Sequence, residues 1–256
     1  MFEKISCIIL AAGKGTRMKS DLPKVLAPLK NKPLIYYVLN SISVNQFNFN
    51  KVVLVVGYKS ADVKNYVSEL NRGLNVEFAL QNEQLGTGHA VMQAENLFVK
   101  DDLTEDILIL YGDVPLLSNN TIKCLLEKHK SNNATLTILT AIFDNPFNYG
   151  RIIRSDAENM HGQIMSIVEE RDANEYQKLI TEINSGIYVV KKDFLFNALK
   201  QIKPANDQNE LYLTDIVNIA SNQNHKIASF VLNNDIEVQG VNTVEQLKEL
   251  EQYVDS

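Results

Sequence analysis

Short apolar runs alternate with amphipathic stretches between residues 5 and 142. Each run is rich in β-branched residues and ends near Gly, Asn or Asp, which is typical of strands in the interior of a sheet. The runs predict strands over 5–10, 52–56, 76–80, 107–111 and 136–142.

Helix signals lie between these runs. The predicted helices cover 34–44 after Pro33, run from Ser60 to Gly73, and run from the capping residue Ser118 to Lys130. Repeated strand–helix–strand units favour parallel strands joined by right-handed crossovers. We therefore expect an α/β fold with a Rossmann-like sheet that is mixed but mainly parallel and is flanked by helices. Ligands bind at the carboxyl ends of the strands in such a sheet.

The alternation changes at about Phe143. A polar loop over 144–151 precedes apolar segments over 164–168 and 183–190, which predict a second lobe packed on the same sheet. A helix over 212–220 is expected to return the chain to the first lobe, where a late strand follows over 237–241.

A final helix is expected close to the end of the sequence. Asn242 or Thr243 can cap it, and Gln246 has the capping-box position relative to Thr243. This helix is still running near residue 256, which leaves open whether the chain is a piece of a longer protein.

Composition narrows the class of partner. The 25 basic and 31 acidic residues give a net charge of −6, which argues against a surface built for DNA or RNA. The two cysteines, Cys7 and Cys124, give neither a disulfide framework nor metal-ligand spacing, and we expect both to be reduced and buried. No apolar run approaches the roughly 18 residues of a membrane span, so we expect a cytoplasmic protein without a membrane partner.

The first candidate site follows the first predicted strand. Gly13 and Gly15 leave backbone amides uncovered in a turn, and Arg17 and Lys24 follow, which favours a phosphate site. The turn matches neither common nucleotide motif, because Gly15 stands where a Ser or Thr would follow the lysine and Met18 replaces the third glycine of a dinucleotide fingerprint. Two glycines alone leave open a plain strand-to-helix turn with solvated cations.

Two further stretches carry candidate chemistry. The run from Gln81 to Ala90 follows the third predicted strand, where Thr87 can cap a helix and His89 fits a structural histidine better than a catalytic base. Asp113 follows a buried strand and so faces the expected ligand crevice, where a carboxylate suits a hard cation such as Mg²⁺. Without further context, Asp113 could be a turn residue and Asn242 a helix cap.

The first stretch, Leu-Ala-Ala-Gly-Lys-Gly-Thr-Arg-Met with Pro23 and Lys24, resembles the signature of the sugar-1-phosphate nucleotidyltransferases. The resemblance implies that the glycine-rich turn wraps a nucleoside triphosphate, that Arg17 contacts the terminal phosphates and that Lys24 reaches the phosphates during reaction. Both cations would stabilise the charge that grows as pyrophosphate leaves. The substrate-binding residues implied in this turn are Leu10, Ala11, Ala12, Gly13, Gly15 and Lys24.

The run from Gln81 to Ala90 resembles the base-recognition segment of the N-acetylglucosamine-1-phosphate uridylyltransferases within that family. This resemblance implies that Gln81, Gly86 and Thr87 meet the uracil and ribose, since an amide offers the donor and the acceptor that uracil requires. The stretch Tyr111-Gly112-Asp113 is similar to a segment in which the tyrosine and glycine contact substrate. The resemblance makes Asp113 a metal ligand, with Asn242 as its partner.

Three segments of the second lobe resemble those that hold the sugar in these enzymes, namely 149–152, 167–170 and 182–187. They imply that Gly150 offers its backbone, that Glu169 accepts from sugar hydroxyls and that Asn184 bonds the sugar or its N-acetyl group. Two positions depart from the family pattern. Asn148 stands where glycine is frequent and Ser185 where threonine is frequent, which bears on the choice of sugar.

The implied enzyme transfers uridylyl from UTP to N-acetylglucosamine 1-phosphate with Mg²⁺, giving pyrophosphate and UDP-N-acetylglucosamine, a precursor of peptidoglycan in cell wall biogenesis. The implied domain spans 1–241, with a nucleotide lobe over about 1–142 and a sugar lobe over about 143–210, and 242–256 begins a helical arm. A left-handed β-helix follows in fused members of the family. Its hexapeptide repeats are not in this sequence, so neither acetyl transfer nor the β-helix trimer is expected of this chain.

Three alternatives stay open. The same reaction can use another sugar 1-phosphate or nucleotide, or the chain can be a non-catalytic homologue that acts as a binding subunit. Retention of Arg17, Lys24, Asp113 and Asn242 together argues against the binding subunit. A dinucleotide-binding dehydrogenase is the weakest alternative, because the fingerprint fails at Met18.

Overall fold

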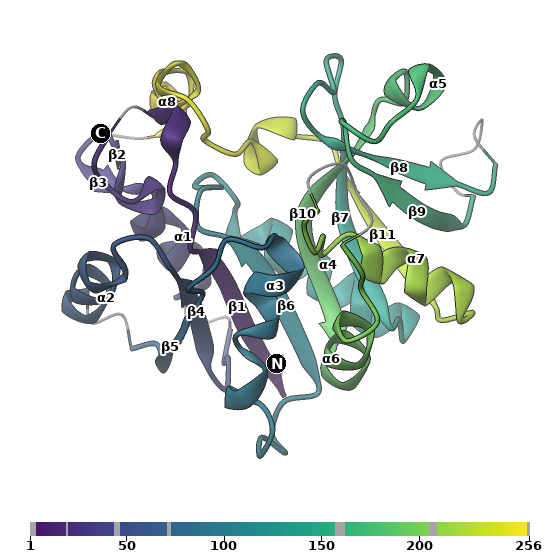
Figure 1. The fold of residues 1–256 in the computed structure, drawn as a ribbon, viewed down its shortest axis with the longest axis horizontal. Coiled ribbons are helices and arrows are strands. Elements are labelled where there is room, and N and C mark those ends of the chain that lie inside the picture. The colour runs from purple at the N-terminus through teal and green to yellow at the C-terminus, as the bar shows by residue number, and fades with distance from the viewer. Residues whose placement is uncertain are drawn as a thin grey trace.

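The computed structural model describes residues 4–18, 20–43, 47–70, 73–156, 162–204 and 209–254. A mixed sheet runs through these residues in the order β11-β7-β10-β6-β1-β4-β5, with β8 beside β10 and β9 beside β8 (Figure 1). Its strands are β1 Ile5–Ala11, β4 Val52–Val56, β5 Val76–Leu80, β6 Asp106–Tyr111, β7 Leu136–Ile142, β8 Gly150–Arg154, β9 Ile164–Val168, β10 Glu182–Lys191 and β11 Ile227–Leu232. A small separate sheet pairs β2 Pro28–Leu29 with β3 Lys32–Pro33.

The strands β1, β4, β5 and β6 of the predicted nucleotide lobe are parallel, as predicted. β1 pairs in parallel with both β4 and β6, and β4 pairs in parallel with β5. β10 runs antiparallel between β6 and β7, and the β8–β9 hairpin extends from the far end of β10. The prediction of a mixed, mainly parallel sheet that carries a second lobe is confirmed.

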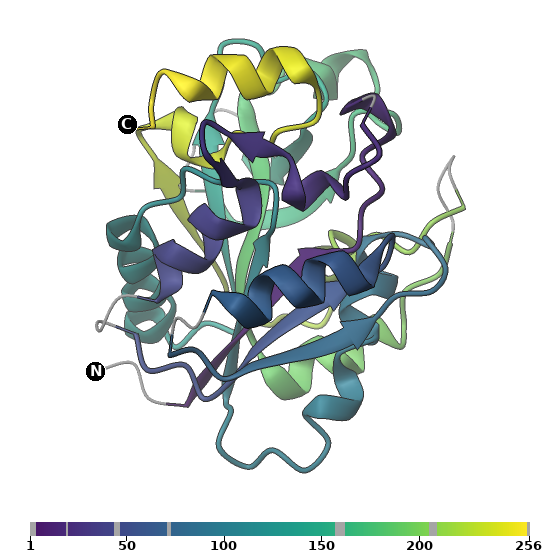
Figure 2. The same ribbon diagram turned by 90° about the vertical axis from the view of Figure 1, so that its left-hand side faces the viewer.

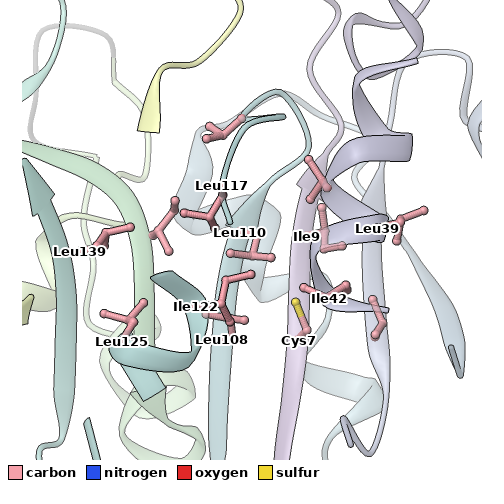
Figure 3. Packing of buried hydrophobic residues seen from close by; sticks show 14 of the residues in the cluster. Cys7, Ile9, Leu39, Ile42, Leu108, Leu110, Leu117, Ile122, Leu125 and Leu139 are labelled. Atoms are coloured by element: carbon pink, nitrogen blue, oxygen red, sulfur yellow. The ribbon is translucent and has the colours of Figure 1, made fainter. Parts of the chain in front are cut away.

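Helices cover both faces of this sheet (Figure 2). On one face, α1, α2 and α4 contribute residues such as Leu39, Val63 and Leu125 to a core that also holds Cys7 and Ile9 (Figure 3). On the other face, α3, α6 and α7 pack their apolar sides against alternate strand residues such as Ile8. The helices are α1 Leu34–Ile42, α2 Ser60–Glu69, α3 Thr87–Met92, α4 Asn119–Asn132, α5 Glu175–Lys178, α6 Lys192–Leu199, α7 Asp215–Asn222 and α8 Val244–Glu251, with 3₁₀ turns at Thr16–Met18, Lys24–Leu26, Glu95–Leu97 and Asp235–Val238.

The cysteine prediction is confirmed in part. Both thiols are free, and Cys7 is fully buried in β1, where desolvation raises the pKa of the thiol. Cys124 on α4 is only half-buried, so the expectation of a buried side chain is wrong for it.

Capping chemistry explains where several helices begin. Ser118 accepts from the Thr121 backbone N–H, as predicted, and Thr243 forms a complete capping box with Gln246. The expected cap at Ser60 is wrong by one position, because Lys59 is the N-cap in a left-handed conformation and Ser60 is the first helical residue. The same helix ends at Glu69, before Gly73, and the predicted end of α1 at residue 44 lies outside the described residues.

The prediction is wrong about the end of the chain in two places. The expected strand over 237–241 is instead the 3₁₀ turn Asp235–Val238 followed by extended chain. The strand that closes the sheet is β11, which pairs in parallel with β7 and was not predicted. Four of its residues are half-buried, which weakens the apolar signal of an interior strand.

The final helix packs on the first lobe, beside the small β2–β3 sheet (Figure 1). Leu250 of α8 and Val241 are buried against Leu29 and Leu34. The division into a domain over 1–241 and an arm from 242 stays a prediction. No helix in the part of the chain that the structure describes is long and apolar enough to cross a bilayer.

A β-bulge in β10 shapes the boundary between the two lobes. The pairing of β10 with β7 shifts register between Asn184 and Tyr188, and Gly186 in this stretch has a φ of +80°. A Cβ atom on Gly186 would lie 2.6 Å from the ring of Tyr111 at the end of β6. The bulge therefore depends on glycine for both its backbone angle and its packing.

We predict that Gly186→Ala lowers the free energy of unfolding by about 3 kcal/mol, since it combines left-handed strain with overpacking. Gly73→Ala is the matched control, because Gly73 has a φ of +67° but nothing within 4 Å of an added Cβ. It should cost only the backbone strain, about 1 kcal/mol. Urea unfolding measures both, and equal losses in the two variants would contradict the packing argument.

Candidate active site

A cavity of about 270 Å³ opens at the carboxyl ends of β1 and β6. Its position is the one expected for a ligand in a sheet of this kind. Ten residues predicted from the sequence line it: Leu10, Ala11, Ala12, Gly13, Lys24, Gln81, Gly86, Thr87, Tyr111 and Asp113. Four lining residues, Val25, Gln84, Ala90 and Glu210, were not predicted as site residues. Gln84 lies within the recognised run, while nothing in the sequence around Glu210 signals a site.

In the glycine turn after β1, Gly15 lies directly against Lys24. Gly15 has a φ of +66°, and a Cβ atom there would lie 2.7 Å from the Cβ of Lys24. Glycine is therefore required for the 3₁₀ turn that carries Arg17 to pass beside the one that carries Lys24. Met18 is buried and anchors the turn in the core that α8 covers.

Four polar side chains meet beside this turn. The Lys24 ammonium donates to Asp113 Oδ2 and, at 2.7 Å, to Asn242 Oδ1. Arg17 Nη2 donates to the same Asn242 oxygen at 2.9 Å. The side chains of Lys24 and Asp113 are 14% and 17% exposed, so this ion pair is largely shielded from water yet borders the cavity. The structure thus brings together the two predicted cations and the two predicted metal ligands.

Backbone contacts hold Asn242 in this position. The Val241 N–H donates to the carbonyl of Asp113 at 2.9 Å, and the Asn242 N–H donates to Gln246 Oε1 at 2.7 Å. Thr243 is the N-cap of α8, so the reading of Asn242 as the cap is wrong. Its side chain is left to face Lys24 and Arg17.

The oxygens of Asp113 and Asn242 fit a hard divalent cation, because both converge on one positive charge, the Lys24 ammonium. Among the residues described, no group of three or more His, Cys, Asp or Glu side chains could hold a metal ion unaided. A magnesium ion here would therefore need water and substrate phosphates as its remaining ligands, which is the usual arrangement for Mg²⁺ with nucleotides.

The opposite end of the cavity is built by the run from Gln81 to Ala90. Gln81 is 3% exposed, and its Nε2 donates to the carbonyl of Gly86 at 3.1 Å. The Thr87 hydroxyl accepts from the Leu213 backbone N–H at 3.0 Å, so it also ties α3 to the segment before α7. His89 contacts Gln81 and Gln93 through its ring nitrogens, which agrees with a structural histidine.

The predicted sugar residues lie outside this cavity, on the second lobe. Glu169 lines a neighbouring pocket of about 260 Å³, and an added Cβ on Gly150 would lie 3.4 Å from Glu169 Oε2. Asn184 Oδ1 accepts from the Gly186 N–H at 3.0 Å and from the Tyr188 hydroxyl at 2.9 Å. Its Nδ2 donates to no residue within the described ranges, which leaves the amide nitrogen for a ligand.

Tyr111 lies between the two halves of the site. It lines the nucleotide-side cavity, and its ring contacts the bulge at Gly186. Burial raises the pKa of its hydroxyl, and the carboxylates of Glu169 and Asp113 raise it further. Tyr111 is therefore close to both the predicted sugar residue Glu169 and the predicted metal ligand Asp113.

The two departures from the family pattern have local explanations. Asn148 has a φ of +70°, a left-handed conformation that asparagine tolerates better than most residues, so it can replace glycine there. The Ser185 hydroxyl donates to the Leu139 carbonyl at 2.6 Å and accepts from the Ile187 N–H at 3.1 Å. Serine thus supplies the hydroxyl that threonine would, and it stabilises the bulge.

Comparison with known proteins agrees with this geometry. Residues 6–236 match the family described as nucleotidyl transferase. The chain belongs to the nucleotidyl transferase family, which confirms the predicted resemblance and excludes a dinucleotide-binding dehydrogenase.

Two relatives within this family match nearly the whole of this chain. The chain is 44% identical over 252 residues to the bifunctional protein GlmU of Caldicellulosiruptor saccharolyticus, covering 98% of this chain and 52% of that protein. It is also 44% identical over 235 residues to the bifunctional protein GlmU of Streptococcus gordonii, covering 92% and 48%. The chain thus spans about half the length of the curated relatives it matches.

The fold is shared with a solved UDP-glucose pyrophosphorylase in complex with UDP-glucose. The TM-score is 0.75 over 97% of each chain, at 20% sequence identity. This likeness confirms the predicted fold class.

Glu169 should make stability depend on pH. Burial raises the pKa of its carboxyl, and repulsion from Asp172 and Asp215 adds to the shift. The folded state therefore binds this proton more tightly than the unfolded state, so its contribution turns unfavourable as pH rises through the shifted range. We predict that Glu169→Gln matches the wild type in unfolding free energy at pH 4 and exceeds it at pH 7.5.

The control for this measurement is Glu175→Gln, since the Glu175 side chain is 91% exposed and makes only a local pair with Lys178. Its difference from wild type should stay near zero at both pH values. An equal effect of Glu169→Gln at pH 4 and pH 7.5 would contradict the burial argument.

Proposed function

We propose that this chain transfers the uridylyl group of UTP to N-acetylglucosamine 1-phosphate, with release of pyrophosphate. The observation that carries the proposal is the meeting of Arg17, Lys24, Asp113 and Asn242 at the edge of a cavity whose far end holds Gln81. Cations for phosphates, oxygens for a metal and an amide for a base are what a nucleotidyl transfer requires. The 44% identity to bifunctional GlmU proteins supports the choice of these substrates.

The reaction needs no protein nucleophile or base. A sugar phosphate oxygen is already anionic at neutral pH and can attack the α-phosphorus of UTP in line, displacing pyrophosphate. Catalysis then comes from positioning and charge. We assign Lys24 to neutralise the attacking phosphate and Arg17 to hold the departing pyrophosphate, and the turn from Leu10 to Gly15 to offer backbone donors to the triphosphate.

Asp113 and Asn242 are the proposed holders of Mg²⁺, since their oxygens already converge on one cation. The ion would neutralise phosphate oxygens as charge moves onto the leaving group. In the structure the Lys24 ammonium contacts both oxygens, so the same ion pair holds the proposed catalytic lysine beside the proposed phosphate site.

The base and the sugar are assigned to opposite sides of Tyr111. Gln81, Gly86 and Thr87 are the proposed contacts for uracil and ribose, with Tyr111 and Gly112 completing the substrate surface. Gly150, Glu169 and Asn184 are the proposed contacts for the sugar. The free Nδ2 of Asn184 suits a sugar hydroxyl or N-acetyl oxygen, and Glu169 suits a hydroxyl donor.

We place this activity in the cytoplasm, in the synthesis of UDP-N-acetylglucosamine for the cell wall, with small-molecule substrates and without a nucleic acid or membrane partner. If the substrate is another sugar 1-phosphate or nucleotide, the same residues are assigned the same roles. A panel of sugar phosphates and triphosphates in a pyrophosphate-release assay separates these cases.

We predict that Asp113→Asn lowers the rate of pyrophosphate release by about 100-fold or more, as expected when a charge-stabilising group is lost. The assay uses UTP, N-acetylglucosamine 1-phosphate and Mg²⁺. Asp102→Asn is the control, because Asp102 is exposed before β6, at the opposite end of the sheet. A wild type without activity would refute the proposed reaction, and an active Asp113→Asn variant would refute the metal assignment.

A further inference from the structure

A buried ion pair lies at the open end of the β8–β9 hairpin, beside the proposed sugar residues. Arg151 Nη2 donates to Glu170 Oε2 at 2.6 Å, and the two side chains are 2% and 18% exposed. Nη1 of the same guanidinium donates to the Tyr149 carbonyl. Arg151 directly follows Gly150 in the sequence. Glu170 directly follows Glu169, so the pair joins two main-chain segments that each carry a proposed sugar contact.

Main-chain pairing holds the two sides of this sugar site unequally. Gly150 is fixed by its register pair in β10, Asn184. The last register pair between β8 and β9 joins Arg151 to Val168. Glu169 lies one residue beyond that pair, outside the sheet. Its position therefore depends on the contacts that hold the chain after β9.

The turn and short helix after β9 have little apolar packing of their own. Between residues 171 and 181, which the structure describes in full, Ala173 is the one buried residue. Arg151 contacts this segment near both ends, because its Nη2 donates to Glu170 and also, at 3.5 Å, to the Lys178 carbonyl at the end of α5. A segment with few buried contacts opens readily. The Arg151 contacts are thus a tie between this segment and β8.

Stability alone does not explain why an ion pair is buried here. Removing a guanidinium and a carboxylate from water costs much of the energy that their attraction returns. Arg151 Nε is buried and has no hydrogen-bond partner among the described residues, which adds to that cost. A charged hydrogen bond does, however, fix the distance and direction between its two partners. Such a constraint is what a binding site at this place requires.

The constrained distance is the one between Gly150 and Glu169. A Cβ atom added to Gly150 would lie 3.4 Å from Glu169 Oε2, so the carboxylate lies directly beside the glycine main chain. The Thr214 hydroxyl donates to the other oxygen, Oε1, at 3.2 Å. That contact orients the carboxylate from the segment before α7, but it does not tie the chain that carries the carboxylate to β8.

We infer that Arg151 is a positioning residue: its bond to Glu170 sets sugar affinity by holding the neighbouring carboxylate against the Gly150 main chain. This inference rests on the proposed function, and it deepens the sugar site of that function. The Arg151 charge also acts on Glu169 directly. Burial raises the pKa of the Glu169 carboxyl, and the Arg151 charge opposes that rise.

The test separates sugar binding from nucleotide binding on the whole chain. Calorimetry with Mg²⁺ gives the dissociation constants for UDP and for UDP-N-acetylglucosamine, and the first divided by the second reports what the sugar adds. Glu170→Ala removes the acceptor, so this ratio should fall about tenfold, as expected for a lost charged hydrogen bond. Glu170→Gln keeps an acceptor for Arg151 and should retain most of the ratio. The dissociation constant for UDP should stay at the wild-type value in both variants.

Arg154 supplies the matched control within the same strand. It is buried and makes a bidentate ion pair with Glu182, at 2.8 and 2.7 Å, but neither of these residues adjoins a proposed sugar contact in the sequence. Arg151→Met should lower the ratio as Glu170→Ala does, whereas Arg154→Met should leave it unchanged. Each of the two arginine variants loses one buried ion pair, so thermal unfolding should show a lower melting temperature in both. Loss of stability alone then cannot produce the difference in ratio.

Four results would overturn the inference: a wild type that binds UDP-N-acetylglucosamine no more tightly than UDP, an unchanged ratio in both Glu170→Ala and Arg151→Met, a ratio in Glu170→Gln as low as in Glu170→Ala, or a fall in Arg154→Met as large as in Arg151→Met. A wild type whose ratio responds as expected and which yet releases no pyrophosphate from UTP and N-acetylglucosamine 1-phosphate would support the inference and refute the proposed reaction. Pyrophosphate release together with an unchanged ratio in both Glu170→Ala and Arg151→Met would overturn the inference and leave the proposed reaction standing.

Discussion

The ammonium of Lys24 makes the contact on which the site depends. It joins Asp113 at the end of β6 to Asn242 before the last helix, and Arg17 reaches the same asparagine oxygen. These contacts hold together three segments that are far apart in the sequence, at one edge of the sheet. Because the pair is largely shielded from water, removing one partner would leave the other charge poorly solvated, so the contact holds these segments together.

The parallel pairing of β1 with β6 makes this contact possible. It places the glycine turn and Asp113 side by side, since both follow the carboxyl ends of neighbouring strands. The antiparallel strand β10 then carries the second lobe, and its bulge brings Gly186 against the Tyr111 ring. One sheet thus carries the proposed phosphate and base residues around one cavity, and the proposed sugar residue Glu169 lines a separate pocket.

The sequence predicts the parts of this site that local chemistry encodes. The strands around β1 and β6 are apolar on both faces, and Ser118 and Thr243 are helix caps that act within three residues. β11 was missed because its half-buried pattern resembles a surface strand, and the expected strand at 237–241 was wrong because Val238 and Val241 are buried by packing on the first lobe. The pairing of Asn242 with Asp113 came from family resemblance and not from the strand assigned before it. The contacts of His89 with Gln81 and Gln93 depend on side-chain orientation, which sequence periodicity does not report.

The central claim is a single direct transfer of uridylyl between two substrates that the protein positions without bonding to either. Exchange of radiolabelled pyrophosphate into UTP tests it most directly, with Mg²⁺ present. The account predicts no exchange with UTP alone and exchange once UDP-N-acetylglucosamine is supplied, because only the reverse of the full reaction regenerates UTP. Exchange without any sugar nucleotide would reveal a uridylyl-protein intermediate and contradict the account, as would the absence of exchange in both cases.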